Sequence, residues 1–269
     1  MSILSGVNPV ICCVPVSPLR AEPWHRSEMV SQLLFGEACD IIEPINREWC
    51  RIRARYDGYE GCCQPAHLVE LTAGQGGDGL VGGGGAKLTA DWVSAVGYDG
   101  RPMMVPLGSE LTGVESGRAF WGDHRIEFSG AGWDPATATR EAAAIARLAH
   151  RFLNTPYLWG GKSVFGIDCS GFAQTVFKFL GVPLLRDACL QAGQGEAVGF
   201  LEETRTGDLA FFDNDEGRIT HVGILLGPGE IIHSSGKVRV DPIDNMGIVN
   251  ADSGVRTHRL RLIKRLLAG

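Results

Sequence analysis

Cys169 is the residue of this sequence whose type and position best suit covalent chemistry. It stands in the run Asp168-Cys169-Ser170-Gly171, where a loop is predicted to turn into a helix over residues 169–180. Free backbone N–H groups and the positive end of the helix dipole stabilise a thiolate at such a position. We therefore predict that Cys169 is a nucleophile. The alternative, a small buried side chain, also describes Cys189.

Two histidines on one predicted hairpin could serve this thiol. His221 and His233 each lie six residues from Gly227, in two β-type runs joined by Gly227-Pro228-Gly229. Antiparallel pairing about that turn places them opposite or diagonal to each other on one face. A nucleophile needs a base, and the base needs a group that fixes its tautomer. We predict that His221 is the base and that His233 orients it.

The loop before Cys169 offers one more polar group. Tyr157 carries a phenol that could assist the Cys169 backbone N–H in holding an oxyanion, or it could be an aromatic anchor of the core. The nearby run Gly161-Lys162-Ser163 resembles the end of a phosphate-binding loop, but the first glycine of that motif is replaced by Pro156. We therefore exclude nucleotide binding.

Composition excludes further classes of protein. The 269 residues are 44% hydrophobic and 21% charged, which is typical of a globular chain with one large domain or two to three small ones. Asp and Glu outnumber Lys and Arg by 31 to 25, so no basic field attracts nucleic acid. A basic run over residues 256–265, which includes His258, alternates with apolar residues and is interpreted as a last strand with one solvated face.

The eight cysteines argue against a disulfide scaffold. Two vicinal pairs, at 12–13 and 62–63, make a poor disulfide framework. We expect the cysteines to be mostly reduced and buried, which indicates a reducing compartment. No C-x2-C pair or His/Cys cluster has zinc-ligand spacing, so we expect neither a metal nor an organic cofactor.

The sequence also bears on location. No window approaches the roughly 18 consecutive apolar residues of a membrane helix, and no Lys or Arg precedes Arg20. We expect no membrane insertion and no signal peptide. A cytoplasmic location is favoured, while a periplasmic or extracellular one stays open. The oligomeric state is open as well, with a monomer favoured.

Three domains and a linker are expected along the chain. Residues 1–73 carry short β-type runs broken by turns, which suggests a small barrel. Residues 74–86 form a glycine-rich linker or loop, and residues 87–134 a second, more irregular β domain. Residues 135–269 begin with a helix, capped by Thr137 or Thr139, and end in strands. Helices grouped before antiparallel strands imply an α+β domain.

The C-terminal part resembles the NlpC family of bacterial cysteine peptidases. Five ordered motifs carry the resemblance: Pro156-Tyr157-Leu158-Trp159-Gly160-Gly161, Asp168-Cys169-Ser170-Gly171-Phe172, Gly207-Asp208-Leu209-Ala210-Phe211-Phe212, Thr220-His221-Val222-Gly223-Ile224 and Ile232-His233-Ser234-Ser235. The N-terminal part resembles bacterial SH3-like domains through Trp49-Cys50-Arg51-Ile52-Arg53 and Asp57-Gly58-Tyr59-Glu60-Gly61. Cys62 stands where that pattern prefers tryptophan.

The resemblance implies two small all-β SH3-like barrels followed by an α+β papain-like cysteine peptidase domain. It implies the same roles for Cys169, His221 and His233 as the residues themselves do, and it places Tyr157 in the oxyanion hole. Relatives with this domain order resemble γ-D-glutamyl-L-diamino acid endopeptidases, which act on peptidoglycan peptides with a free N-terminal L-Ala. In that subgroup the first barrel narrows the cleft and helps to bind the N-terminal end of the substrate.

The resemblance also implies a substrate pocket. Asp168, Ser170 and Asp187 are expected to bind the L-Ala amine and the γ-D-Glu residue, with Tyr59 contributed by the barrel. A free ammonium in a partly desolvated pocket does need a charged partner. Two alternatives stay open, because Asp168 could cap the helix and Asp187 could be a solvated loop residue. Ala188 stands where subgroup relatives often have serine.

The function expected is that of a cysteine endopeptidase. It would hydrolyse the γ-D-glutamyl to diamino acid bond of peptidoglycan stem peptides through a thioester acyl-enzyme. Two other functions remain: a catalytically weak peptidoglycan-binding module, and an amidase or acyltransferase on the same fold. The expected partners are small peptidoglycan-derived peptides.

Overall fold

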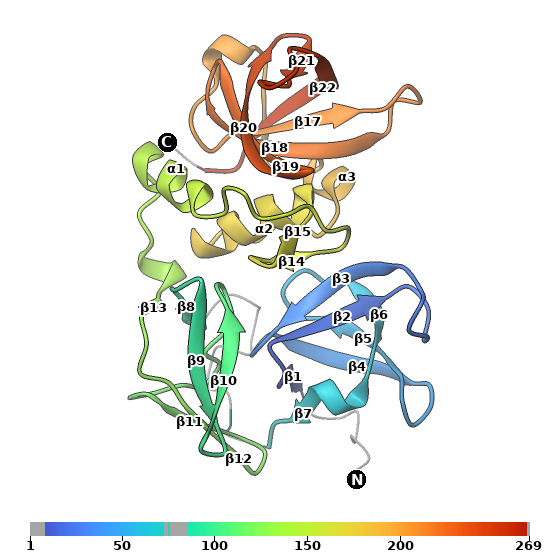
Figure 1. Ribbon diagram of the computed structural model, residues 1–269, viewed down its shortest axis with the longest axis vertical. Helices are drawn as coiled ribbons and strands as arrows, with labels where there is room; N and C mark the ends of the chain where they lie inside the picture. The colour runs from blue at the N-terminus through green and yellow to red at the C-terminus, as the bar shows by residue number, and fades with distance from the viewer. Residues whose placement is uncertain (1–8, 73–74, 76–85, 268–269) are drawn as a thin grey trace. The chain divides into compact units, whose positions relative to one another are not determined.

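The computed structural model describes residues 9–72, 75 and 86–267, which belong to two compact units (Figure 1). The first unit comprises Met1–Thr137 and Trp159–Val164, and the second comprises Ala138–Leu158 and Phe165–Gly269. The expected glycine-rich linker, residues 74–86, lies almost entirely outside the described residues.

The first unit opens with a seven-stranded antiparallel sheet in the order β3-β2-β6-β5-β4-β1-β7. Its strands are β1 (Val10–Cys12), β2 (Val16–Arg20), β3 (Met29–Leu34), β4 (Ala38–Pro44), β5 (Cys50–Ala54), β6 (Glu60–Cys63) and β7 (Leu68–Glu70). A short 3-10 helix, Pro65–His67, precedes β7. The sequence predicts β-type runs at residues 9–16, 29–34, 39–45, 49–54 and 61–63, which match β1, β3, β4, β5 and β6. It predicts neither β7 nor β2, in which Pro18, without an N–H group, interrupts the β pattern.

A four-stranded sheet in the order β10-β9-β12-β11 follows, with a separate pair of short strands beside it. The sheet contains β9 (Val93–Tyr98), β10 (Arg101–Pro106), β11 (Arg118–Trp121) and β12 (His124–Glu127), and the pair is β8 (Leu88–Thr89) and β13 (Gly132–Trp133). The sequence predicts a strand at residues 110–114, but this prediction is wrong, because the chain turns there, with Gly113 at a φ of 68°. The 3-10 helix Pro135–Thr137 ends this part.

Two separate SH3-like barrels are not confirmed. In the described residues, the ladder of the first sheet stays open between β3 and β7. The two sheets also share one apolar core, in which Phe35 packs against Trp121 with ring centroids 4.7 Å apart. Strand patterns in a sequence report the buried face of each strand, but neither closure of a sheet nor the sharing of a core.

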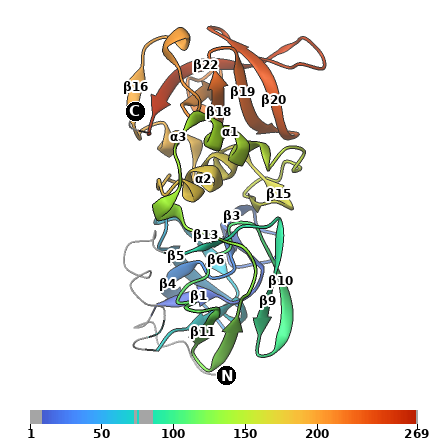
Figure 2. The same ribbon diagram turned by 90° about the vertical axis from the view of Figure 1, so that its left-hand side faces the viewer.

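The second unit places its helices before its strands, as the α+β prediction requires. The helices are α1 (Ala142–His150), α2 (Cys169–Phe179) and α3 (Ala188–Gln191), with the 3-10 helix Leu201–Glu203 after them. Short strands β14 (Lys162–Ser163) and β15 (Gly166–Ile167) precede α2, the former counted with the first unit. Figures 1 and 2 both show α1 and α2 together on one side of the strands.

The strands of the second unit form a sheet in the order β16-β22-β17-β18-β19-β20-β21. Their bounds are β16 (Glu196–Val198), β17 (Leu209–Asp213), β18 (Ile219–Gly227), β19 (Glu230–Ser235), β20 (Lys237–Asp244), β21 (Gly247–Val249) and β22 (Arg256–Arg265). Because β22 also pairs with β21, six of these strands close into a barrel. The basic run at 256–265 is therefore a strand, as predicted, and it closes the ring.

Helix α1 does not begin where the sequence predicts. The cap predicted at Thr137 or Thr139 is wrong: α1 begins at Ala142, and Glu141 occupies the N-cap without a side-chain hydrogen bond. The spacing of Ile145, Leu148, Ala149 and Phe152 predicts one apolar face for this helix, and the burial of Ile145 and Leu148 confirms it. No helix within the described ranges has the length and apolar character that crossing a bilayer requires.

The shared core of the first unit can be tested at Trp121. Its side chain is fully buried, and its indole N–H donates to the Thr112 carbonyl at 2.9 Å. We expect Trp121→Ala to lower the free energy of unfolding by about 3–5 kcal/mol, because it leaves a cavity beside Phe35. Urea denaturation followed by circular dichroism measures this.

Trp92→Ala is the matched control for that substitution. Trp92 is 44% exposed, and we expect its truncation to change the free energy of unfolding by less than about 0.5 kcal/mol. Equal effects of the two substitutions would contradict a core shared by both sheets.

Candidate active site

Cys169 is the first residue of α2, as predicted, and its side chain is buried. Asp168 occupies the N-cap with an extended backbone, and its Oδ1 accepts a hydrogen bond of 2.6 Å from the Gly171 N–H. Backbone hydrogen bonds from Val222 and Ser170 also reach the Cys169 sulfur. Since Val222 follows His221 on β18, the sulfur lies beside the strand that carries the predicted base.

The surroundings of Cys169 do not favour a thiolate in the free protein. Burial, followed by the negative charge of Asp168, raises the pKa of Cys169 to about 12. The two backbone hydrogen bonds and Arg186 lower the pKa by less than that. Desolvation of a charged sulfur therefore outweighs the helix start, which the sequence alone suggested would dominate.

His221 and His233 form the hydrogen-bonded pair that the hairpin predicted. Gly223 pairs with His233 across β18 and β19, so His221 lies diagonal to His233. The distance from His221 Nε2 to His233 Nδ1 is 2.8 Å, and both side chains are buried. Burial, then the charges of His233 and His258, lowers the pKa of His221 well below its usual value. His221 is therefore a neutral imidazole at neutral pH.

A carboxylate missed by the sequence analysis continues this chain of hydrogen bonds. Asp241 Oδ2 lies 2.9 Å from His233 Nε2, and Arg239 Nε donates to the same oxygen at 2.7 Å. The signal was available: His233 pairs with Arg239 about the Gly236 turn, so Asp241 is diagonal to His233.

His258, on β22, was also missed. Its ring stacks on that of His221, with centroids 4.1 Å apart and an angle of 26°. Burial, then the charge of His233, lowers the pKa of His258 to about 4. This contact could not be inferred from the sequence, because β22 reaches the site only through its pairing with β17 and β21.

The ring nitrogens of His221, His233 and His258 lie within 4.8 Å of one another. Among the described residues, this is the one group of three or more side chains that could hold a metal ion. Their nitrogens make hydrogen bonds within the protein instead. His221 and His233 share one, and His258 Nδ1 lies 2.8 Å from the Thr257 hydroxyl. An ion would have to displace the proton between His221 and His233, so we treat the group as a hydrogen-bonded cluster.

Tyr157 lies beside Cys169. Its backbone N–H donates to the Gly236 carbonyl at 2.9 Å, and its backbone bridges to Ile167. Burial, then the nearby acidic groups of Cys169 and Asp168, raises the pKa of Tyr157 to about 12. The phenol therefore keeps its proton and is a hydrogen-bond donor near the sulfur.

Asp168 is bound to Arg186, a third residue that is not predicted from the sequence. Arg186 Nη2 donates to Asp168 Oδ2 at 2.6 Å, and Nη1 donates to Asp168 Oδ1 at 3.0 Å and to the Ser170 hydroxyl at 2.9 Å. Arg186 is 1% exposed. The alternative that Asp168 caps the helix is thus confirmed, and the cap is locked by a buried guanidinium. The sequence gives no local sign that an arginine is buried.

Asp187 and Tyr59 are the other two predicted substrate ligands. Asp187 is the N-cap of α3 and makes no side-chain cap hydrogen bond there. Tyr59 lies in the first unit, directly before β6, and its N–H donates to Asp57 Oδ1 at 3.0 Å. The geometry brings Asp168 and Ser170 together at Cys169, while Tyr59 belongs to the other unit.

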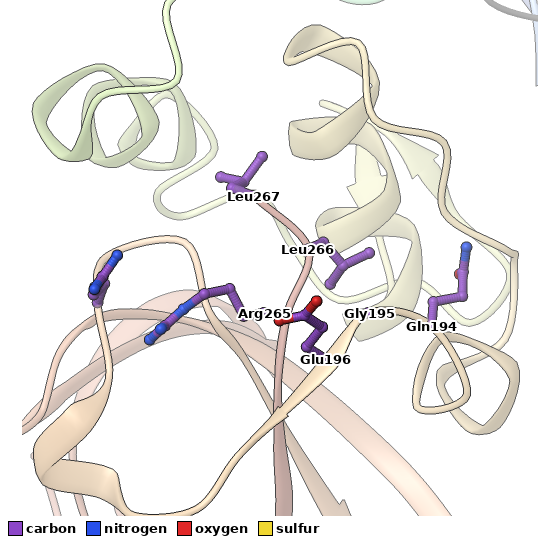
Figure 3. Close-up of a pocket in the computed structure, with 7 residues that line it drawn as sticks. Gln194, Gly195, Glu196, Arg265, Leu266 and Leu267 are labelled. Atoms are coloured by element: carbon purple, nitrogen blue, oxygen red, sulfur yellow. The ribbon is translucent and has the colours of Figure 1, made fainter. Parts of the chain in front are cut away.

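A hollow of about 580 Å³ lies at the end of β22 (Figure 3). None of the predicted site residues lines it. Its walls are formed by Gln194, Gly195, Glu196, Arg205, Arg265, Leu266 and Leu267. The charge of Arg265 is already matched by Asp208, at 2.7 Å. We assign no function to this hollow.

Comparisons with known proteins agree with this geometry. Residues 154–257 match the NlpC/P60 family, and residues 19–67 match the bacterial dipeptidyl-peptidase Sh3 domain. An NlpC/P60 family protein from Bacillus cereus ATCC 10987 has a similar structure, with a TM-score of 0.77, 19% identity, and coverage of 96% of this chain and 99% of that chain.

Curated relatives agree as well. Dipeptidyl-peptidase 6 of Lysinibacillus sphaericus is 28% identical over 250 residues, which cover 84% of this chain and 88% of the relative. Gamma-D-glutamyl-L-lysine dipeptidyl-peptidases of Bacillus cereus and Bacillus subtilis are 38% and 49% identical over 45% and 31% of this chain. The chain spans only 37% and 28% of the lengths of those two relatives.

A helix-start cysteine packed on an antiparallel sheet, with a hydrogen-bonded histidine pair on that sheet, is an arrangement that suits nucleophilic catalysis by a cysteine with a histidine base. The N-terminal match adds an SH3-type domain of the kind found in bacterial dipeptidyl-peptidases. The chain belongs to the NlpC/P60 family.

The protonation state of the site can be tested directly. Because the pKa of Cys169 is raised to about 12, its side chain stays a thiol at neutral pH. Because the pKa of His221 is lowered well below its usual value, its imidazole is neutral at the same pH. The difference in absorbance at 240 nm between the wild type and Cys169→Ala should therefore show no step between pH 5 and pH 9. A step in that range would reveal a thiolate–imidazolium pair and contradict a neutral site.

The buried ion pair at the start of α2 gives a second test. We expect Arg186→Met to lower the free energy of unfolding by about 3–5 kcal/mol, because Asp168 then keeps a buried charge without its partner. Arg53→Met is the control, since Arg53 and Glu60 form an exposed pair worth at most about 1 kcal/mol. Urea denaturation compares the two. A loss at Arg186 no larger than that at Arg53 would show that the pair does not hold the helix start.

Proposed function

We propose that this protein is a cysteine endopeptidase that hydrolyses the γ-D-glutamyl to diamino acid bond of peptidoglycan stem peptides with a free N-terminal L-Ala. The observation that carries the reaction class is the buried Cys169 at the start of α2 beside the His221–His233 pair. The bond is supported by the names of the Bacillus relatives and by the dipeptidyl-peptidase type of the N-terminal domain.

The proposed mechanism begins with a neutral thiol and a neutral imidazole. As the sulfur attacks the γ-carbonyl carbon, His221 takes the thiol proton, so no free thiolate accumulates. Tyr157 and the Cys169 N–H donate to the oxygen that becomes negative. His221 then gives its proton to the leaving amine of the diamino acid, and a thioester remains on Cys169. Water, deprotonated by His221, hydrolyses the thioester and restores the thiol.

The proposed substrate pocket lies around the start of α2. The Asp168 carboxylate already carries the charge of Arg186, at 2.6 Å, so we assign to Asp168 and Ser170 the polar groups of γ-D-Glu. We assign the L-Ala ammonium to Asp187, and we keep Tyr59 as a further proposed ligand of the substrate. A carboxylate is the partner that a desolvated ammonium requires.

Two finer points of organisation and location are also proposals. We propose that residues 1–73 and 87–134 are two SH3-like domains that precede a catalytic domain over residues 135–269. We further propose a cytoplasmic site of action on small imported wall peptides. All eight cysteines are thiols in the structure, which is the state that a reducing compartment maintains.

The test of this function is a comparison of two peptides. L-Ala-γ-D-Glu-meso-diaminopimelate and its N-acetylated copy are incubated under reducing conditions, and release of the diamino acid is followed by chromatography. We expect the wild type to cleave the free-amine peptide only. Cys169→Ala should be inactive, while Cys189→Ala, at an exposed cysteine, should keep wild-type activity.

Three outcomes would redirect the proposal. Cleavage of both peptides would refute the amine pocket but keep the peptidase. Binding of the peptide without cleavage would favour the peptidoglycan-binding module. Transfer or hydrolysis of lipid esters, with neither peptide cleaved, would favour an amidase or acyltransferase.

A further inference from the structure

We propose that Asp241 is a positioning residue that sets the proton arrangement of the two active-site histidines. The chain of hydrogen bonds runs from Asp241 Oδ2 to His233 Nε2, at 2.9 Å, and from His233 Nδ1 to His221 Nε2, at 2.8 Å. All three side chains are buried. Each of the three nitrogens in these two hydrogen bonds has one partner, so the partner decides whether the nitrogen carries a proton.

The Asp241 carboxylate decides which atom donates and which accepts in each of these hydrogen bonds. An ionised carboxylate only accepts hydrogen bonds, so His233 must carry its proton on Nε2. With its one proton held on Nε2 by Asp241, His233 has a lone pair on Nδ1, which accepts from a proton on His221 Nε2. His221 is left with an unprotonated Nδ1. This is the tautomer that a base must have if its Nδ1 is to receive the thiol proton.

The surroundings of Asp241 keep it ionised and fixed. Burial raises its pKa, but hydrogen bonds from His233, Arg239 and the Ala251 N–H together hold the pKa of Asp241 well below its usual range. Arg239 binds both carboxylate oxygens, at 2.7 and 2.8 Å, and the Ala251 N–H donates to Oδ1 at 2.8 Å. Oδ2 is thereby directed at His233.

The other charged and titratable groups near Asp241 do not compete for His233. Arg239 also pairs with Asp252, at 2.9 Å, which leaves the guanidinium shared between two carboxylates. The ring of His258 stacks on His221, and its Nδ1 lies 2.8 Å from the Thr257 hydroxyl. With two carboxylates against one arginine, the local charge is negative. A positive charge formed on His221 during proton transfer is therefore stabilised through His233.

The role of Asp241 concerns both the histidine tautomers and the rate of hydrolysis. The tautomers belong to the free protein and do not depend on any substrate. The effect on hydrolysis rests on the proposed peptidase function.

The decisive variant is Asp241→Asn. An asparagine amide fits the same space and can donate a hydrogen bond to His233 Nε2, which would move the His233 proton to Nδ1 and the His221 proton to Nδ1 as well. The base nitrogen would then be blocked while the geometry stays intact. Asp244→Asn is the matched control, since Asp244 lies on the same strand in an exposed pair with Arg256.

Three measurements follow the variants. Long-range proton–nitrogen NMR of the free protein reports the tautomers of His221 and His233. Alkylation of Cys169 by iodoacetamide at pH 7.5, mapped by mass spectrometry with exposed Cys189 as the internal reference, reports whether His221 accepts the thiol proton. Cleavage of L-Ala-γ-D-Glu-meso-diaminopimelate reports kcat and KM.

We expect Nε2–H on both histidines in the wild type and Nδ1–H on both in Asp241→Asn. Alkylation of Cys169 should fall at least about tenfold and kcat about 10²-fold, with KM little changed. Asp244→Asn should match the wild type in all three. These results together would support the inference.

Two results would overturn it. A proton on His233 Nδ1 in the wild type would do so without any variant, which keeps the test valid if Asp241→Asn folds poorly. Wild-type alkylation and kcat in a folded Asp241→Asn would do so as well. If the wild type cleaves no peptide, the proposed function fails, but the tautomers and the alkylation rates still decide the role of Asp241.

Discussion

The register of three antiparallel strands is the constraint on which the candidate site depends. Pairing of Gly223 with His233 and of His233 with Arg239 brings His221, His233 and Asp241 into one line across β18, β19 and β20. A slip of one residue would turn every side chain of a strand to its other face and separate all three. The glycine-rich turns at 227–229 and at 236 hold this register, so the two hairpins do the positioning that a sequence motif only suggests.

Burial explains why the resting site is neutral. Charged sulfur and charged imidazole are both disfavoured where water is excluded, and this effect raises the pKa of Cys169 while it lowers that of His221. The helix start and the backbone hydrogen bond from Val222 act in the opposite direction but more weakly. In the proposed mechanism the charges therefore form only as the bond to the substrate forms, which is when fixed dipoles contribute most.

Local patterns predicted the parts of the site that local geometry decides. Cys169 at a helix start, Tyr157 in the preceding loop and the diagonal pair His221 and His233 all follow from turns and periodicity over short stretches. Asp241 was within reach of the same hairpin argument. Arg186 and His258 were not, because burial of an arginine and the arrival of β22 depend on packing between distant segments. The closure of the second-unit barrel and the core that the two sheets of the first unit share are properties of the same kind.

Two buried carboxylates flank the proposed proton transfer, and each is matched by an arginine. Arg186 neutralises Asp168 beside the sulfur, where an unpaired negative charge would oppose a developing thiolate. Arg239 is shared between Asp241 and Asp252, so the side behind the histidines stays negative, which favours a developing imidazolium. The two ion pairs thus differ in net effect at the two ends of the transfer. A proton that moves from Cys169 to His221 leaves the neighbourhood of Asp168, whose charge Arg186 neutralises. It approaches Asp241, which shares Arg239 with Asp252, so the fixed charges favour transfer in this direction.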